Sequence, residues 1–316
     1  MPGAGLSGDR GRGGDRLWWA ALSQVEGLGA AGLLRLARAF GSPEAALQAS
    51  PQELVSHGRL TVQQAQEVKL AAASLPAVEQ RIAAWARAGI ELIAAGEPGY
   101  PLGLTDLKAP PPLLYLRGEL RPEDRRAVAV VGTREPTREG ELIAERLAQG
   151  LAERGLTIVS GLARGIDTAG HRGALAAQAG RTIAILGCGL LRIYPPENAW
   201  LAEEIAHRGC LMAEVPPETE VNRRFLLARD RLQAASSRAV IVVQAHRECG
   251  SIVTASHARA CGRLLLGVPW PRPPFSEGWD RLRKLGAQPV DPEGDLDAVA
   301  EQLDSWTGPP AQSPLL

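Results

Sequence analysis

From about residue 121 to residue 304 the chain alternates short apolar runs with longer amphipathic segments. Each of the first six runs is followed by turn residues and then by apolar positions at helical spacing. Strands that are apolar at nearly every position are buried on both faces, which is typical of a parallel sheet covered by helices. The pattern predicts an α/β fold with a doubly wound parallel sheet. The predicted strands are Ala127–Val131, Leu156–Ser160, Thr182–Leu186, Cys210–Glu214, Ala239–Val243, Leu264–Val268 and Gln288–Val290.

Residues 15–75 show helical spacing instead. Two amphipathic runs, Leu17–Val25 and Leu33–Phe40, are separated by Gly27-Leu28-Gly29. This arrangement predicts a small all-helical domain of the SAM or helix–hairpin–helix type, in which glycine amides can approach a phosphate at the second helix. An ordinary αα corner gives the same pattern, and a protein-docking role stays equally open.

The segment 76–120 is too short to be a domain of its own. It contains a helical pattern from Val78 to Ala88, consecutive prolines that forbid helix, and an apolar run, Leu113–Leu116, that predicts a strand. We expect this segment to pack as an extension on the domain formed by residues 121–304. Residues 1–14 and 305–316, rich in glycine, charge or proline, are predicted to be disordered tails.

The 35 basic and 35 acidic residues balance, so total charge does not predict a nucleic-acid partner. The four cysteines form no C-x-x-C pair, and no histidine lies at ligand spacing, so neither a metal site nor a disulfide framework is expected. Free thiols fit a reducing cytoplasm. The N-terminus lacks the apolar stretch of a signal peptide, and no apolar run approaches 18 residues, so no membrane association is predicted.

Small and basic residues gather in the loops that follow the predicted strands. In an open parallel sheet, ligands bind beyond the carboxyl ends of the strands, where loops meet helix N-termini. Tight turns also use glycine for steric reasons alone, but four such loops on one edge predict an anionic ligand, held by exposed amides and guanidinium groups. Asp167 is expected to cap the second of the helices that follow these loops. The loop residues predicted to bind are Gly132, Thr133, Arg134, Ser160, Gly161, Arg164, Gly165, Gly250, Ser251 and Thr254.

Known nucleotide fingerprints do not match these loops. The first loop lacks the G-x-G-x-x-G spacing, and no Walker lysine follows any of them, so NAD, FAD and P-loop nucleotides are disfavoured and no cofactor is predicted. Residues 220–263 indicate a polyanionic partner instead of a nucleotide cofactor, because this segment has eight arginines and only three acidic residues. This excess suits a polyanion, although a solvated helix face would look similar.

Further predicted contacts come from this basic segment: Arg223, Arg224, Phe225, Arg229 and Arg231. Phe225, among the guanidinium groups, suits stacking on an unpaired base, or it belongs to the core. Together with the loops, these residues predict a protein that binds single-stranded DNA without acting chemically on it.

Catalytic patterns are poor. His171 and Asp167 lie four residues apart, but no nucleophile is tied to them by spacing. The enzymatic alternative is a nucleotide-cleaving phosphoribohydrolase on a related Rossmann-like fold, with Glu214 or Asp167 as its carboxylate. A third possibility is a scaffold that docks partners through its N-terminal helices alone.

The ordered loop motifs resemble those of the DNA-processing protein A (DprA, also called Smf) family of bacterial transformation proteins, over about Gly99 to Gly286. Five family patterns match in order. G-S/T-R-x-x-S/T fits Gly132–Thr137, and S-G-x-A-x-G-I-D with a later histidine fits Ser160–Asp167 with His171. Y-P-x-x-N fits Tyr194–Asn198, R-N-R fits Arg229–Arg231, and S-G-S-x-x-T-A fits Cys249–Ala255.

This resemblance implies an extended Rossmann-like domain, a homodimer, single-stranded DNA bound in a basic pocket, and loading of RecA recombinase in the cytoplasm during natural transformation. It implies that Arg134, Arg229 and Arg231 contact DNA, together with Arg223, Arg224 and Phe225. A C-terminal winged-helix module found in many relatives is not expected here.

Four positions depart from the family pattern. Asp230 replaces the usual asparagine, which places a negative charge beside the expected site, Cys249 replaces a serine, and Gly170 stands where alanine is usual. Trp270 stands where glycine is typical. None of these changes removes the basic pocket.

Overall fold

The computed structural model describes residues 12–306. The chain forms two compact units, one comprising residues up to Tyr100 together with Ala109–Leu114, and the other Pro101–Lys108 together with the residues from Tyr115 onward. The predicted extension, 76–120, is thus divided between the two units. The predicted tails, 1–14 and 305–316, lie largely outside the described residues; the first helix begins at Arg12 and the last ends at Ser305.

The first unit is mainly helical. Its third, fourth and fifth helices begin directly after Ser42, Ser50 and Thr61, whose hydroxyl oxygens each accept a hydrogen bond from the first turn. Its elements are α1 (Arg12–Leu22), α2 (Ala30–Phe40), α3 (Pro43–Gln48), α4 (Pro51–Ser56), α5 (Val62–Ala73), α6 (Leu75–Arg87) and β1 (Ile90–Ala94). The glycine turn separates α1 from α2, as expected. Strand β1, which begins just after Gly89 at φ 74°, was not predicted.

The second unit contains the predicted α/β sheet. Its strands are β2 (Leu113–Gly118, shared with the first unit), β3 (Ala127–Val131), β4 (Thr157–Ser160), β5 (Thr182–Leu186), β6 (Cys210–Ala213), β7 (Ala239–Val242), β8 (Leu264–Gly267) and β9 (Gln288–Pro289). The strand order is β1-β2-β6-β5-β4-β3-β7-β8-β9. All pairs from β6 to β9 are parallel, and the strands match the prediction to within one residue.

One strand from the segment before the predicted parallel strands joins the sheet in the opposite direction. Strand β2 pairs antiparallel with β6, with Tyr115 opposite Ala213 and Gly118 opposite Cys210. The chain enters β2 from a proline-rich connection and not through a helical crossover, so the right-handed βαβ rule does not constrain its direction. The sheet is therefore mixed, though mostly parallel.

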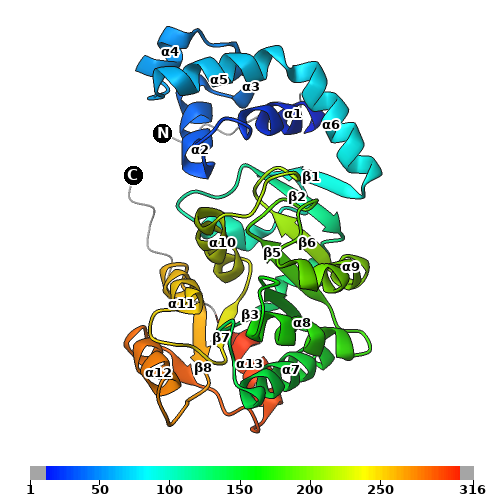
Figure 1. The fold of residues 1–316 in the computed structure, drawn as a ribbon, viewed down its shortest axis with the longest axis vertical. Coiled ribbons are helices and arrows are strands. Elements are labelled where there is room, and N and C mark those ends of the chain that lie inside the picture. The colour runs from blue at the N-terminus through cyan, green and yellow to red at the C-terminus, as the bar shows by residue number, and fades with distance from the viewer. Residues whose placement is uncertain (1–11, 307–316) are drawn as a thin grey trace. The chain divides into compact units, whose positions relative to one another are not determined.

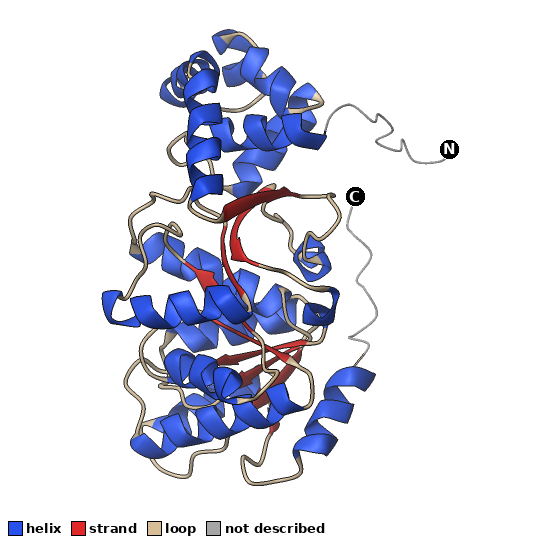
Figure 2. Ribbon diagram, turned by 90° about the vertical axis from the view of Figure 1, so that its right-hand side faces the viewer, coloured by secondary structure: helices blue, strands red, loops and turns tan. Residues whose placement is uncertain are grey.

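Helices surround the strands of this unit (Figures 1 and 2). They are α7 (Arg138–Glu153), α8 (Ile166–Ala176), α9 (Ala199–Arg208), α10 (Arg223–Ala235), α11 (Gly250–Ala260), α12 (Phe275–Lys284) and α13 (Leu296–Ser305), with short 3-10 turns η1 (Leu102–Asp106), η2 (Pro122–Arg125) and η3 (Pro196–Asn198). Val128, Val130 and Ile241 of the central strands pack with Leu147 and Leu151 of α7 in a fully buried core. Within residues 12–306, every helix is too short or too polar to cross a bilayer.

The connectivity determines where a ligand can enter. From β3 the chain moves outward through β4, β5 and β6, and then returns to β7 on the other side of β3. The loops after β3 and β7 therefore diverge to opposite faces of the sheet. Such a switch point leaves a crevice at the carboxyl ends of the strands, which is where open α/β sheets bind ligands.

Candidate functional site

A cavity of about 660 Å³ lies at this switch point. We call it the switch-point cavity; its walls are the loop after β3, the face of α10, the loop after β7 and the first turn of α11. The predicted binding residues that line it are Gly132, Thr133, Arg134, Arg223, Arg229, Gly250, Ser251 and Thr254. A small adjoining hollow adds Gly161 and Arg164 and shares Arg134, Tyr194 and Arg229 with the larger cavity. Ten of the fifteen predicted residues therefore line these two adjoining cavities.

Five predicted residues are absent from the lining of these two cavities: Ser160, Gly165, Arg224, Phe225 and Arg231. Helical periodicity explains the three on α10. Arg223, Leu226, Leu227 and Asp230 are spaced to share one face, and this face lines the cavity. Arg224 and Phe225 lie on the neighbouring faces, with Phe225 half-buried.

Arg231 lies in a different environment. Its guanidinium pairs with the carboxylate of Glu214, at the end of β6, and both side chains are largely buried, at 19% and 15% exposure. Burial raises the pKa of Glu214, and the neighbouring guanidinium opposes that rise. The structure thus gives Arg231 a partner within the protein.

Arg229 is the buried centre of the site. Its side chain is only 5% exposed, with Nη1 3.9 Å from Oδ2 of Asp167 and Nε 3.4 Å from Oδ1 of Asp230. With its amide oriented to suit its neighbours, Gln233 accepts hydrogen bonds from Nη1 of Arg229 at 2.7 Å and from the Gly161 amide at 2.8 Å. One guanidinium therefore faces two buried carboxylates and one amide oxygen.

The loop after β4 corrects one prediction. Its glycines were expected to present free amides as an anion nest, with Asp167 as a helix cap. Instead, the Gly161 amide donates to Oδ2 of Asp167 at 3.1 Å, so the protein's own carboxylate occupies this nest. The reason is local geometry, because the turn folds Asp167 back over the amide six residues before it. Ser160 is also committed, since its hydroxyl donates to the carbonyl of Val130 at 2.7 Å.

His171 supports the same loop from beneath. Its Nε2 accepts a hydrogen bond from the Leu162 amide at 3.3 Å, and its Nδ1 lies 2.7 Å from Oγ1 of Thr182, which itself donates to Ile158. The ring is completely buried, and burial together with the charge of Arg229 lowers the pKa of His171 to about 3. A neutral imidazole protonated on Nδ1 satisfies all these contacts. His171 thus holds Leu162 in its left-handed conformation, at φ 59°.

Gly165 has a steric role in the same loop. Its φ is 73°, and a Cβ at this position would lie 2.5 Å from the carbonyl oxygen of Thr133. That carbonyl accepts a hydrogen bond from the amide of Ile166, which joins the loops after β3 and β4. Gly165 therefore allows the close approach that forms the cavity wall.

Asp230 brings a second carboxylate to the cavity. Burial, the largest cause, raises the pKa of Asp230 to about 6, although the charge of Arg229 acts in the opposite direction. Burial also raises the pKa of Asp167, again against the attraction of Arg229. Both carboxylates are therefore held in the protein at a cost that Arg229 only partly offsets.

Arg134 differs from Arg229 in being exposed. Its side chain makes no ion pair or hydrogen bond to any residue in 12–306. The backbone beside it is rigid, since the Thr133 amide donates to Gln244 at 2.7 Å and Thr137 caps α7 through the Gly140 amide at 3.1 Å. The loop after β3 thus presents a free guanidinium at the cavity from a fixed base.

The lining residues that were not predicted as contacts include Tyr194, Leu226, Gln233 and His246. Tyr194 could have been found, because it is one of only three tyrosines and begins the Y-P-x-x-N motif. Leu226 and Gln233 could not, since nothing in the sequence shows which face of α10 turns toward the sheet. His246 carries no such signal in its own sequence context.

The departure at Trp270 has a structural explanation. Its indole Nε1 donates to the Val243 carbonyl at 2.6 Å, and the ring packs against the main core and lies 6.0 Å from the ring of Phe275. The side chain that replaces the usual glycine is therefore accommodated within the fold.

Comparison with known proteins agrees with this geometry. The profile of the family described as DNA recombination-mediator protein A matches residues 91–303, about two thirds of the chain. Protein Smf of Synechocystis is 35% identical over 81% of this chain and 65% of its own length. DNA processing protein DprA of Bacillus subtilis is 33% identical over 74% of this chain and 80% of its own length.

Two solved structures are similar to this one. The X-ray structure of DprA from Streptococcus pneumoniae has a TM-score of 0.72 and 28% identity, covering 90% of this chain and 97% of that one. A structure of DprA from Helicobacter pylori, described in terms of its single-stranded DNA binding mode, has a TM-score of 0.60 and 31% identity, covering 68% of this chain and 95% of that one. The matched family profile, the shared motifs and the shared fold agree, and the chain belongs to the DNA recombination-mediator protein A (DprA/Smf) family.

Proposed function

We propose that this chain binds single-stranded DNA in the switch-point cavity and acts as a recombination mediator without catalysing a reaction. The observation that carries the proposal is that two arginines line one cavity at the topological switch point: the exposed Arg134, which has no hydrogen bond or ion pair within residues 12–306, and the buried Arg229. The relative from Helicobacter pylori, whose fold this chain shares, is described as having a single-stranded DNA binding mode.

The composition of the cavity favours an unpaired strand over a duplex. Arg134 and Arg223 offer exposed guanidinium groups for phosphates, and the ring of Tyr194 faces the same space. An aromatic ring can stack only on a base that is free of its partner, whereas phosphate contacts alone do not distinguish one strand from two. The site thus has parts for both backbone and base.

The remaining parts of the proposal rest on family membership. We propose that the protein forms a homodimer in the cytoplasm, protects incoming strands during natural transformation, and loads RecA on them. The four cysteines, which are free thiols, suit a reducing compartment.

The phosphoribohydrolase alternative is less well supported by the site. Both carboxylates nominated for it face arginines, Asp167 beside Arg229 and Glu214 against Arg231, and both are buried. A catalytic carboxylate would have to reach a bound substrate. Glu214 lines neither cavity, and Asp167, which lines the switch-point cavity, is engaged by Arg229 and by the Gly161 amide. The arrangement therefore favours binding.

Fluorescence anisotropy with labelled oligothymidine, performed at several salt concentrations, tests the proposal. We expect binding that depends little on sequence, is weaker for blunt duplex, and falls steeply with salt because counterions are released. Arg134→Ala should weaken binding by about 1–3 kcal/mol, as for the loss of a hydrogen bond to a charged group.

Arg125→Ala is the matched control, because Arg125 is exposed at the amino edge of the sheet, just before β3. It should bind as the wild type does. Equal losses in the two variants, or cleavage of nucleoside monophosphates without binding to oligonucleotides, would contradict the proposal.

A further inference from the structure

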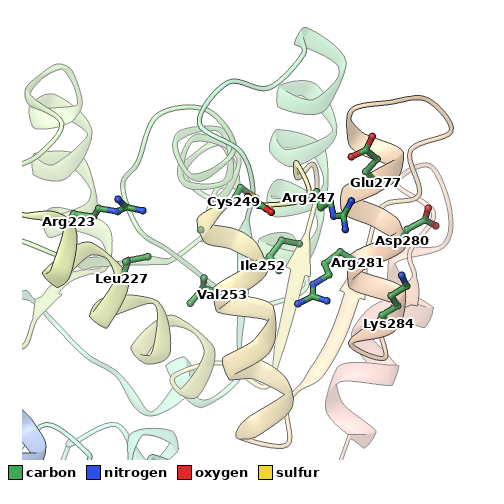
Figure 3. A pocket seen from close by; sticks show the side chains of 12 residues that line it. Arg223, Leu227, Arg247, Cys249, Ile252, Val253, Glu277, Asp280, Arg281 and Lys284 are labelled. Carbon is green, nitrogen blue, oxygen red and sulfur yellow. The ribbon is translucent and has the colours of Figure 1, made fainter.

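A second cavity, of about 640 Å³, adjoins the switch-point cavity between α10, α11 and α12 (Figure 3). We call it the α12 cavity. The two cavities share four lining residues, Arg223, Leu227, Cys249 and Gly250, all at the start of α10 or α11. The residues that line only the α12 cavity are Arg247, Glu248, Ile252, Val253, Glu277, Asp280, Arg281 and Lys284. A ligand can therefore pass from one cavity to the other over the N-terminus of α11.

The cations of the α12 cavity have no hydrogen-bond or ion-pair partner in the part of the chain that the structure describes. Arg223, Arg247, Arg281 and Lys284 are exposed, and their side chains form no ion pair or hydrogen bond within residues 12–306. Elsewhere in this unit the arginines that pair do so closely: Nη2 of Arg126 lies 2.7 Å from Asp304, and Nη2 of Arg181 lies 3.0 Å from Asp124. Other exposed arginines, such as Arg125 and Arg259, also lack an ion pair within residues 12–306, but at this cavity four cations line one space.

Three acidic residues also line the α12 cavity and reduce its positive charge. Asp280 is neutralised by a residue outside the cavity, since its Oδ1 lies 2.6 Å from Nη2 of Arg283. Figure 3 shows Arg281 turned from α12 toward α11, and Asp280 turned away on the other side of α12. Four cations therefore face two uncompensated carboxylates, Glu248 and Glu277.

The middle of the cavity is apolar. Leu227 of α10 and Ile252 and Val253 of α11 lie between Arg223 of α10 and the cations of α12 (Figure 3). The first turn of α11 adds the positive end of its helix dipole at the junction with the switch-point cavity. Apolar surface between rows of positive charge suits the sugar and base of a nucleotide with phosphates on either side.

We propose that a single strand bound in the switch-point cavity continues over the start of α11 into the α12 cavity, where Arg247, Arg281 and Lys284 bind its phosphates. This inference rests on the proposed function. It divides the DNA interface into a first part, which a short strand can fill, and an extension, which only a longer strand reaches. Arg223, shared by both cavities, lies at the boundary.

The test compares two strand lengths in two variants. The double variant Arg281→Ala/Lys284→Ala removes two cations from α12, and Arg125→Ala/Arg259→Ala removes two exposed cations from the opposite, amino edge of the sheet. Affinities are measured by anisotropy for oligothymidines of about 5 and about 20 nucleotides, lengths that span the usual range of single-strand sites.

We expect the α12 variant to bind the longer strand about tenfold more weakly, with a slope of log K against log salt shallower by about 1.4, as for two lost phosphate contacts. Its affinity for the short strand should equal that of the wild type. The amino-edge variant should match the wild type for both lengths.

Wild-type affinity of the α12 variant for the longer strand would overturn the extension, leaving the cavity to another acidic ligand, such as a protein partner. Equal weakening for both strand lengths would also overturn it, because a short strand does not reach α12. If the wild type bound neither strand, the proposed function itself would fall, and the extension with it. The wild-type measurement therefore separates failure of the function from failure of the extension.

Discussion

The guanidinium of Arg229 lies in the space that a side chain at position 161 would occupy. A Cβ placed on Gly161 would be 1.3 Å from Nη1 of Arg229 and 2.6 Å from the side-chain amide group of Gln233. Glycine is thus required here by the close approach of a buried cation. The main role of Gly161 is therefore to admit Arg229, because its own amide is already bonded within the protein.

Gly161→Ala should consequently displace Arg229 from Asp167 and leave that buried carboxylate without its cation. We expect a loss of about 3–5 kcal/mol in the free energy of unfolding, the usual result of breaking a buried ion pair. Urea denaturation followed by circular dichroism measures it.

The control is Gly170→Ala, on the helix that follows the same loop. Its nearest contact would be Val130 Cγ1 at 3.3 Å, and alanine favours helix, so the free energy of unfolding should stay within about 1 kcal/mol of the wild type. Similar results for the two variants would show that Arg229 does not depend on the space at Gly161.

Asp230 should make both stability and DNA binding depend on pH. Its pKa is raised to about 6 in the folded protein from an ordinary value of 3.8. The folded state therefore holds this proton more tightly than the unfolded chain does. The resulting destabilisation, about 2–3 kcal/mol, is complete above pH 6 and disappears as the pH falls below about 4.

Asp230→Asn removes that cost, so the variant should be more stable than the wild type at pH 7.5 and equal to it near pH 4. Binding of oligothymidine should strengthen in the wild type between pH 7.5 and pH 5.5, as a charge facing the polyanion is neutralised, and should change less in the variant. Asp291→Asn, at an exposed residue remote from the cavity lining, serves as the control. Parallel pH profiles in all three proteins would contradict this role.

Tyr194, and not Phe225, is expected to stack on a base. Tyr194 lines both the switch-point cavity and the hollow beside it, whereas Phe225 lines neither. Tyr194→Ala should weaken oligothymidine binding by about 1–3 kcal/mol, the usual value for one stacked base. Tyr194→Phe should bind nearly as well as the wild type, because the ring and not the hydroxyl makes the contact.

Phe225→Ala provides the comparison, since it removes a ring from the same unit without changing the cavity. A larger loss in Phe225→Ala than in Tyr194→Ala would restore the assignment made from the sequence.

Arg231 is expected to act in folding more than in DNA binding. Arg231→Ala leaves the largely buried Glu214 carboxylate without its cation and should lower the free energy of unfolding by about 2–3 kcal/mol. The double variant Arg231→Met/Glu214→Gln should recover most of that loss. The affinity of the folded single variant for oligothymidine should stay within about twofold of the wild type, whereas a loss as large as that of Arg134→Ala would show that Arg231 contacts DNA.

The sequence by itself determined the parallel sheet, the positions of its strands and the edge at which the loops gather. Hydrophobic periodicity suffices for this, because strands buried on both faces must be apolar throughout, and parallel strands place all their following loops at one edge. Arg134 could be placed at this edge of the sheet from the sequence alone, since its loop directly follows the central strand.

Only the tertiary structure decided which groups remain available at that edge. The face of α10 that turns inward exposes Leu226 and Asp230 to the cavity in place of Phe225. The Gly161 amide is bonded to Asp167, and Arg231 is bonded to Glu214. The α12 cavity likewise depends on how α12 packs beside α11. Each of these outcomes depends on contacts between segments distant in the sequence or on the rotation of a helix about its axis, which local spacing does not determine.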